Sequence, residues 1–287
     1  MTAAIEVLRA GPLTTVQDLG RPGLAHLGVP RAGALDAPAL RAANRLVANP
    51  EDAAGLEVTV GGCRLRLRDA RTVAVTGAPA SITVDGQPAG YGVPVRVPAG
   101  GVLTLGPARQ GVRTYLAISG GVAVPAVLGS RSTDTLSGLG PPPLRDGDVL
   151  PLGQPRPATS TLDPVEWRAP GPEIRLRIRL GPRDDWFTDE AIRTLCRTPY
   201  TLSPMSNRVG ARLTGAALGR RRAGELEPEG LVLGAVQVPA DGQPLVFLAD
   251  HPTTGGYPVI AVVDAADLPA LAQARPGATV TFHGPQR

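Results

Sequence analysis

The sequence contains no lysine, because all 29 of its basic residues are arginine. A Schiff base with pyridoxal phosphate (PLP), a biotinylated lysine, the phosphate-binding lysine of a Walker A loop and a Ser-Ser-Lys amidase centre each need an amine that this chain lacks. The sequence therefore excludes PLP chemistry, covalently attached biotin and a self-contained amidase of this type.

Aromatic residues and cysteines are also scarce: aromatic residues make up 3% of the chain, and the only cysteines are Cys63 and Cys196. Few aromatic rings are left to stack on bases, and the longest basic run is three arginines, 220–222, so we expect no nucleic-acid partner. The cysteines show no CxxC spacing, which indicates two reduced, buried thiols and no metal site.

Long apolar runs are missing as well. No uncharged apolar stretch reaches the ~18 residues that a membrane helix needs. The N-terminal segment carries Glu6 in a short alternating pattern, where a signal peptide has a longer apolar run. We therefore expect a cytoplasmic protein with no membrane partner.

The composition favours a β-rich fold. The 287 residues include 36 glycines and 31 prolines, and strand-like segments of four to seven residues recur between turn residues along the chain. The length predicts about two domains. We place an N-terminal β subdomain at 1–165 and a C-terminal β subdomain at 172–287, with the proline-rich segment 141–172 as the connector.

Three short helices and two tight turns are predicted. One helix begins after a capping Asp36, with Pro38 in its first turn, and stops at Asn49-Pro50. A second follows Thr188 and ends before Pro199, and a third spans about 267–274. Asp-Gly pairs at 85–86 and 241–242 predict two-residue hairpin turns with positive φ at both positions.

The usual catalytic signatures HExxH, GxSxG and GxGxxG are absent, but three polar, glycine-containing clusters fall in predicted turns. The first, 14–36, carries Asp18 and Arg21, which either bind a ligand or form an ion pair with each other, and Asp36, which is either a helix cap or a general base.

The second and third clusters, 201–210 and 250–258, are rich in groups that hold anions or carbonyl oxygens. A hydroxyl-stabilised turn with a surface arginine, or an ordinary glycine hairpin, has the same composition. The candidate residues are Ser203, Ser206, Asn207 and Arg208 in the second cluster, and Thr253, Thr254, Gly255, Gly256 and Tyr257 in the third.

Five strings in this order resemble the family known as KipA, allophanate hydrolase subunit 2 or component C of 5-oxoprolinase. They are TTVQDLGRPG, GALDAPALRAAN, RTYLAISGG, SNRVGARL and TTGGYP, and they span residues 14–258. The chain is also similar to the carboxyltransferase region of urea carboxylases.

The resemblance implies a mainly β protein of two cyclophilin-like β-barrel subdomains with a few short helices. It also implies a permanent heteromer with a KipI-like component B, and a component A, which together open 5-oxo-L-proline to L-glutamate with ATP bound somewhere in the complex. Carried over by motif are catalytic Asn207, Arg208 and Tyr257, and substrate-binding Asp18, Arg21, Asp36, Ser203, Ser206, Thr253, Thr254, Gly255 and Gly256.

Two other functions stay open. A carboxyltransferase or allophanate hydrolase subunit needs a separate biotin-carrying protein or a separate amidase, since this chain has no lysine. A KipA-type regulator that binds KipI has no catalytic role. In the leading interpretation, the chain is a hydrolase subunit that is inactive alone.

Overall fold

A computed structural model of the chain describes residues 3–157, 164–166, 170–171, 173–222, 224 and 226–284. These fall in two compact units: unit 1 comprises Met1–Arg21 and Ala32–Ala169, and unit 2 comprises Pro22–Arg31 and Pro170–Arg287. A boundary drawn along the sequence cannot show that 22–31 belongs with the second unit. Residues 167–169 and 172, next to the predicted boundary, lie outside the described part.

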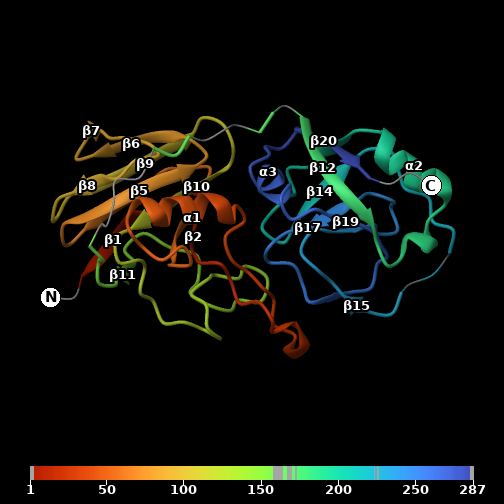
Figure 1. The fold of residues 1–287 in the computed structure, drawn as a ribbon, viewed down its shortest axis with the longest axis horizontal. Helices are drawn as coiled ribbons and strands as arrows, with labels where there is room; N and C mark the ends of the chain where they lie inside the picture. Colours follow the sequence, from red (N-terminus) through yellow and green to blue (C-terminus); the bar gives the residue numbers. More distant parts are fainter. Residues whose placement is uncertain are drawn as a thin grey trace. The chain divides into compact units, whose positions relative to one another are not determined.

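Unit 1 consists of two antiparallel sheets and one helix (Figure 1). The six-stranded sheet has the order β11-β1-β4-β9-β6-β7 and the five-stranded sheet the order β2-β3-β10-β5-β8. The strands are β1 (Ala4–Arg9), β2 (Leu13–Gln17), β3 (Gly55–Thr59), β4 (Cys63–Leu67), β5 (Arg71–Gly77), β6 (Ala80–Val84), β7 (Gln87–Pro88), β8 (Val95–Val97), β9 (Val102–Ala108), β10 (Arg113–Ile118) and β11 (Val149–Pro151).

The burial pattern of these strands shows how the sheets are layered. Strand β4 alternates buried and exposed residues, so one face is in the core and the other in solvent. Every residue of β10 is buried, because helix α1 (Ala37–Leu46) covers the outer face of the five-stranded sheet (Figure 1). The main core, which includes Ile5, Leu56 and Leu103, lies between the two sheets.

Unit 2 is built around a closed barrel of seven strands in the order β12-β19-β16-β17-β14-β13-β20. The barrel strands are β12 (Glu173–Leu180), β13 (Tyr200–Leu202), β14 (Gly210–Thr214), β16 (Ala235–Gln237), β17 (Leu245–Phe247), β19 (Val259–Val263) and β20 (Thr279–His283). Outside it are the two-stranded sheet of β15 (Glu229–Gly230) and β18 (Thr254–Gly255), the helices α2 (Asp189–Arg197) and α3 (Leu268–Ala272), and the 3-10 turns η1 (Ala25–Leu27) and η2 (Asp184–Trp186). The mainly β prediction with a few short helices is confirmed.

The three predicted helices are confirmed, and two have the capping bonds that polar residues before a helix indicate. Asp36 Oδ1 accepts from the amide of Ala39 at 3.1 Å, and Thr188 Oγ1 accepts from the amide of Ala191 at 3.1 Å. Asp36 is therefore a helix cap.

Of the two predicted hairpin turns, one is confirmed and one is wrong. Asp85 and Gly86 have φ of 50° and 80°, as the predicted hairpin turn requires. At 241–242 the prediction is wrong, since positive φ occurs only at Gly242 and the connection between β16 and β17 is longer than two residues.

The proline-rich segment 141–172 is more than a connector, because it contributes β11 to the six-stranded sheet. Val149 pairs with Glu6 of β1, and β11 is the outermost strand. An edge position suits a strand that ends in proline, since proline has no N–H to donate and the missing donor can face away from the sheet.

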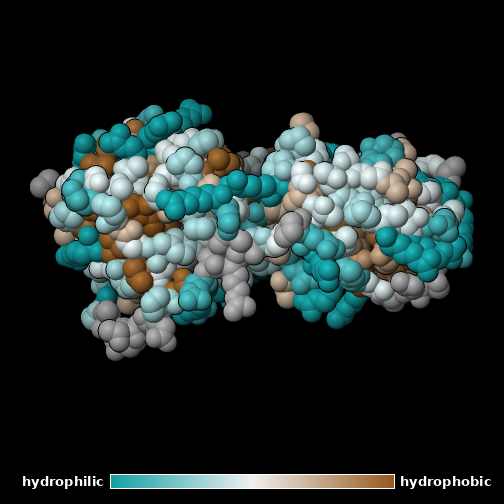
Figure 2. Space-filling view, turned by 90° about the horizontal axis from the view of Figure 1, so that it is seen from above, coloured by the Kyte–Doolittle hydropathy of each residue, from teal (hydrophilic) through white to brown (hydrophobic). Residues whose placement is uncertain are grey.

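Hydrophilic residues cover much of the face shown in Figure 2. Within the described residues, no helix is long and apolar enough to cross a membrane.

Candidate functional site

The second and third sequence clusters meet in unit 2 at Arg208 and Asp250. Strands β14 and β17 pair, with Gly210 opposite Phe247, and beyond them the backbone of Asp250 donates to the carbonyl of Arg208 at 3.1 Å. The turn before β14 and the turn after β17 therefore start from the same point of the barrel.

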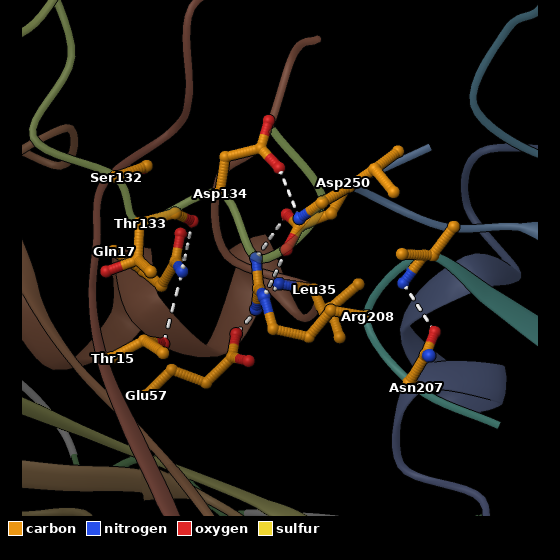
Figure 3. Close-up of polar contacts among 12 residues, drawn as sticks. Thr15, Gln17, Leu35, Glu57, Ser132, Thr133, Asp134, Asn207, Arg208 and Asp250 are labelled. Atoms are coloured by element: carbon orange, nitrogen blue, oxygen red, sulfur yellow. Dashed lines mark hydrogen bonds and ion pairs between the residues drawn. The ribbon is translucent and has the colours of Figure 1, made fainter. Parts of the chain in front are cut away.

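The side chains of Arg208 and Asp250 form a buried ion pair at this point (Figure 3). Nε and Nη2 of Arg208 each donate to one carboxylate oxygen of Asp250 at 2.9 Å, and the side chains are 1% and 0% exposed. Such a bidentate contact fixes both partners in orientation. We expected Arg208 to hold an anionic group of a ligand. Its Nε and Nη2 instead bind a carboxylate of the protein itself.

Two serines of the second cluster stabilise its turn. Ser203 Oγ accepts from the amide of Met205 at 3.2 Å, and Ser206 Oγ accepts from the amide of Arg212 at 3.0 Å. These are local side-chain-to-backbone bonds of the kind that define hydroxyl-stabilised turns.

Asn207 combines a structural oxygen with an exposed position. Its Oδ1 accepts from the amides of Val209 at 2.9 Å and Gly210 at 3.3 Å, as Figure 3 shows in part. The residue is exposed. Asn207 Oδ1 is occupied by these two amides, so the side-chain nitrogen, a donor, is the group of Asn207 that can bind a ligand.

The third cluster forms a short ribbon. Thr254–Gly255 (β18) pairs with β15, and the carbonyl of Tyr257 accepts from Gln237 Nε2 at 2.9 Å. A Cβ on Gly255 would lie 2.8 Å from Gln237 Nε2, so only glycine fits there without displacing that side chain.

The other residues of this cluster differ in exposure. Thr253 accepts a backbone bond from Leu231 at 2.9 Å, and Gly256 accepts one from Leu226 at 3.3 Å. Thr254 is exposed, and Tyr257 is 43% exposed. Both residues are therefore accessible from solvent. Tyr257 precedes Val259 at one end of the paired barrel strands, whereas Asn207 precedes Gly210 at the other end, so the structure does not bring these two candidates together.

In unit 1, Asp18 is an acceptor for the chain segment 130–132. Its Oδ1 accepts from Ser130 Oγ at 2.6 Å, Ser132 Oγ at 2.5 Å and the amide of Gly20 at 2.8 Å, and its Oδ2 from the amide of Arg131 at 2.6 Å. The residue is 8% exposed. Its carboxylate is thus fully engaged within the fold.

Arg21 is buried, and its partners in the described part of the chain are backbone carbonyls. Its Nη2 donates to the carbonyl of Ser132 at 2.7 Å and its Nε to that of Val127 at 3.3 Å, while Nη1 has no partner in the described part of the chain. The residue is 2% exposed. Of the two alternatives left open for Asp18 and Arg21, the ion pair between them is wrong, because hydroxyl and amide donors occupy that carboxylate.

A buried network around Asp36 was not predicted from the sequence. The amide of Asp36 donates to the hydroxyl of Tyr115 at 2.8 Å, and that hydroxyl donates to Glu57 Oε2 at 2.8 Å. Burial, with the negative charges of Glu57 and Asp36, raises the pKa of Tyr115 well above its usual value, so the phenol stays protonated. Arg113 lies 3.6 Å from Glu57 Oε1 and forms a buried ion pair with it.

Tyr115 and Arg113 lie in the string RTYLAISGG. The string indicated that this segment belongs to the family, but it did not indicate that these two side chains form a buried network. Glu57 sits inside an ordinary strand pattern, and only the register that puts it opposite Tyr115 shows the network.

The two cysteines lie outside the three sequence clusters. Both cysteines are free, as predicted, although Cys196 is only partly buried. Burial raises the pKa of the Cys63 thiol to about 11. Among the described residues, no group of three or more His, Cys, Asp or Glu side chains is arranged to hold a metal ion.

A model of the family described as "Carboxyltransferase domain, subdomain A and B" matches residues 27–284. The chain belongs to this family. The match includes the whole of the second and third clusters, and it confirms the resemblance drawn from the five strings.

Relatives of this carboxyltransferase-domain chain include proteins named for 5-oxoprolinase and proteins named for urea amidolyase. It is 41% identical to component C of the 5-oxoprolinase of Escherichia coli (strain K12) over 281 residues, which cover 97% of this chain and 90% of that protein. The crystal structure of TTHA0988 is 39% identical, with a TM-score of 0.89, and the match covers 98% of this chain and 56% of that one. The K. lactis urea amidolyase structure is 31% identical, with a TM-score of 0.90, and the match covers 98% of this chain and 18% of that one.

The chain therefore spans about half the length of TTHA0988 and less than a fifth of the urea amidolyase. The same fold occurs as a separate polypeptide and as part of longer chains.

Proposed function

We propose that this chain is component C of an ATP-dependent 5-oxoprolinase, which opens 5-oxo-L-proline to L-glutamate together with a KipI-like component B and a component A. The observation that carries the proposal is the match to the Escherichia coli component C, which covers 97% of this chain and 90% of that protein. The urea amidolyase, by contrast, is matched over only 18% of its length.

The reaction explains why the chain needs other proteins. A lactam is opened slowly by water. Transfer of the γ-phosphoryl group of ATP to the lactam oxygen, with release of ADP, makes the carbonyl carbon more electrophilic. Water then adds to that carbon, the C–N bond breaks with protonation of the leaving nitrogen, and the resulting acyl phosphate is hydrolysed by a second water to the carboxylate and inorganic phosphate. A phosphate-binding lysine and a clustered metal site are the usual tools for that transfer. The chain has no lysine, so a phosphate-binding lysine has to come from another chain. The complex as a whole binds ATP.

The side chains offered to substrate are the exposed ones of the second and third clusters. Asn207, Thr254 and Tyr257 are neutral donors that can orient a carboxylate or carbonyl oxygen. Arg208, held by Asp250, positions the turn that carries Asn207. We therefore assign substrate contact to Asn207, with Thr254 and Tyr257 as separate candidate contacts, and a positioning role to Arg208.

A carboxyltransferase acting with a biotin-carrying partner is the second candidate. It is favoured by the likeness to the K. lactis urea amidolyase, with a TM-score of 0.90. Because no lysine is present, biotin has to arrive on another protein.

The test is to express the chain with the proteins encoded beside its gene and to measure substrate-dependent ATP hydrolysis with 5-oxo-L-proline, urea and allophanate in parallel. We expect hydrolysis with 5-oxo-L-proline only, and only in the complete mixture. A response to urea that requires a biotinylated protein would favour the second candidate.

Asn207→Asp and Tyr257→Phe separate an active-site role from an interface role. Aspartate keeps an oxygen for the amides of Val209 and Gly210 and removes the amide donor, and Tyr257 is exposed, so we expect folded proteins. Loss of turnover with the complex intact supports substrate contact. Loss of association instead indicates a KipA-type regulatory interface.

A further inference from the structure

A cavity lies at one end of unit 1, where strand β1 begins and strands β4 and β11 end. Its volume is about 830 Å³, and the residues that line it include Ala3, Arg68, Asp69, Arg71, Val149 and Leu152. A volume of this size is typical of sites for small molecules. None of the lining residues belongs to the three sequence clusters, so this cavity shares no residue with the candidate site described above.

Arg71, at the start of β5, is a buried arginine in the wall of this cavity. Its side chain is 4% exposed, and its Nε donates to Asp69 Oδ2 at 2.6 Å. Nη1 donates to the carbonyls of Ser119 at 3.2 Å and Gly153 at 3.1 Å. Nη2 has no acceptor among the residues that the structure describes, and it is not enclosed by the protein. Because Arg71 lines the cavity, this nitrogen can donate to a ligand held there.

Arg68 brings a second guanidinium group to the same wall. Its backbone is fixed, because its amide donates to the carbonyl of Ala4 at 3.0 Å, and the residue is exposed. Within the described part of the chain its side chain forms no ion pair, whereas Arg71 is paired with Asp69. The cavity therefore carries one positive charge that the described residues do not compensate.

Aliphatic groups form another part of the wall. Val149 is 45% exposed on β11, the outermost strand of the six-stranded sheet (Figure 1). Leu152 is fixed beside it, since its amide donates to the carbonyl of Ala3 at 2.9 Å. A ligand with an apolar body would remove the exposed valine from water, and a fully polar ion such as phosphate would not.

We propose that this cavity binds a small organic monocarboxylate. Its carboxylate accepts from Arg71 Nη2 and from the guanidinium of Arg68, and its apolar body lies against Val149. One negative charge matches the single uncompensated guanidinium, and hydrogen bonds between a guanidinium and a carboxylate are charge-assisted. The site shares no residue with the candidate site, so the proposal does not depend on the reaction assigned to the chain.

The test measures binding of valerate to the full chain by ligand-observed NMR titration. Valeramide has nearly the same shape without the charge, and inorganic phosphate has charge without the apolar body. We expect valerate to bind and neither of the other two probes to displace it.

Two variants with a matched control locate the binding. Arg68→Met removes the uncompensated charge, and Arg64→Met is the control, because Arg64 is an exposed arginine of β4 that does not line the cavity. We expect Arg68→Met to weaken valerate binding about tenfold and Arg64→Met to leave it unchanged. Val149→Ser, also at an exposed position, should weaken it about threefold. Arg71 is kept, since its loss would also remove the bonds to Ser119 and Gly153.

Equal weakening by Arg64→Met overturns the proposal, because general surface charge then accounts for binding. Valeramide that binds as tightly as valerate overturns it as well, since the carboxylate then plays no part. Displacement of valerate by phosphate, or no binding of valerate to the wild type, has the same consequence.

Discussion

Arg21 and Arg208 are both 2% exposed and both stand in sequence motifs, but they are held in different ways. Arg208 in unit 2 forms a bidentate ion pair with Asp250, whereas Arg21 in unit 1 donates, among the residues that the structure describes, to backbone carbonyls. The carboxylate near Arg21 in sequence, Asp18, binds hydroxyls and amides instead. A motif arginine is thus no sign of a ligand site until its acceptor is known.

The largest effect is expected for Asp250→Asn. The substitution leaves the buried Arg208 charge without its carboxylate, which costs about 3–5 kcal/mol in the free energy of unfolding. Urea denaturation followed by circular dichroism measures it. The double variant Arg208→Met/Asp250→Leu removes both charges and should recover much of this loss. A loss below about 1 kcal/mol for the single variant would contradict the role given to this ion pair.

Asp18→Asn is expected to cost about 2–4 kcal/mol, because charge-assisted hydrogen bonds are lost and the new amide group faces donors. The same denaturation experiment applies, with Asp52→Asn, an exposed carboxylate, as the control. If Asp18→Asn were as stable as its control, Asp18 would not hold the segment 130–132.

Arg21→Met sharpens the comparison between the two arginines. The substitution removes two hydrogen bonds to carbonyl groups, and Nη1 has no partner among the described residues. We therefore expect the free energy of unfolding to fall by about 1–2 kcal/mol. The result should fall clearly below that of Asp250→Asn. Equal losses would mean that a carboxylate partner makes no difference at these sites.

An exposed Arg–Asp pair gives the smallest effect. Hydrogen bonds from Arg177 lower the pKa of Asp267, so the pair stabilises the protein above the ordinary carboxyl pKa of 3.8, and this stability is lost as the pH falls through the lowered value. The Arg177 side chain is 61% exposed, and solvent screens the pair. Asp267→Asn should reduce the stability lost on acidification from pH 6 to pH 3 relative to the wild type. An unchanged pH dependence would show that the pair contributes nothing.

Local features were predictable from the sequence. Asp36 and Thr188 mark helix starts because a side-chain oxygen before a helix caps its first amides, and Asp85-Gly86 marks a hairpin through its need for positive φ. Family motifs pointed to the turns around Asn207 and Tyr257.

Partners far apart in sequence were not predictable. Asp250 lies 42 positions after Arg208, and Ser132 lies 114 after Asp18. Glu57 and Tyr115 meet only through the register of β3 and β10. These contacts depend on which strands pair, and periodicity within one strand carries no information about its neighbour.

The most direct test of the proposed function is L-glutamate formation from 5-oxo-L-proline and ATP, measured in the three-component mixture with and without this chain. We predict that glutamate forms only when this chain is present, and that the chain alone forms none. Equal glutamate formation without the chain, or no formation in a complete mixture of folded components, would contradict it.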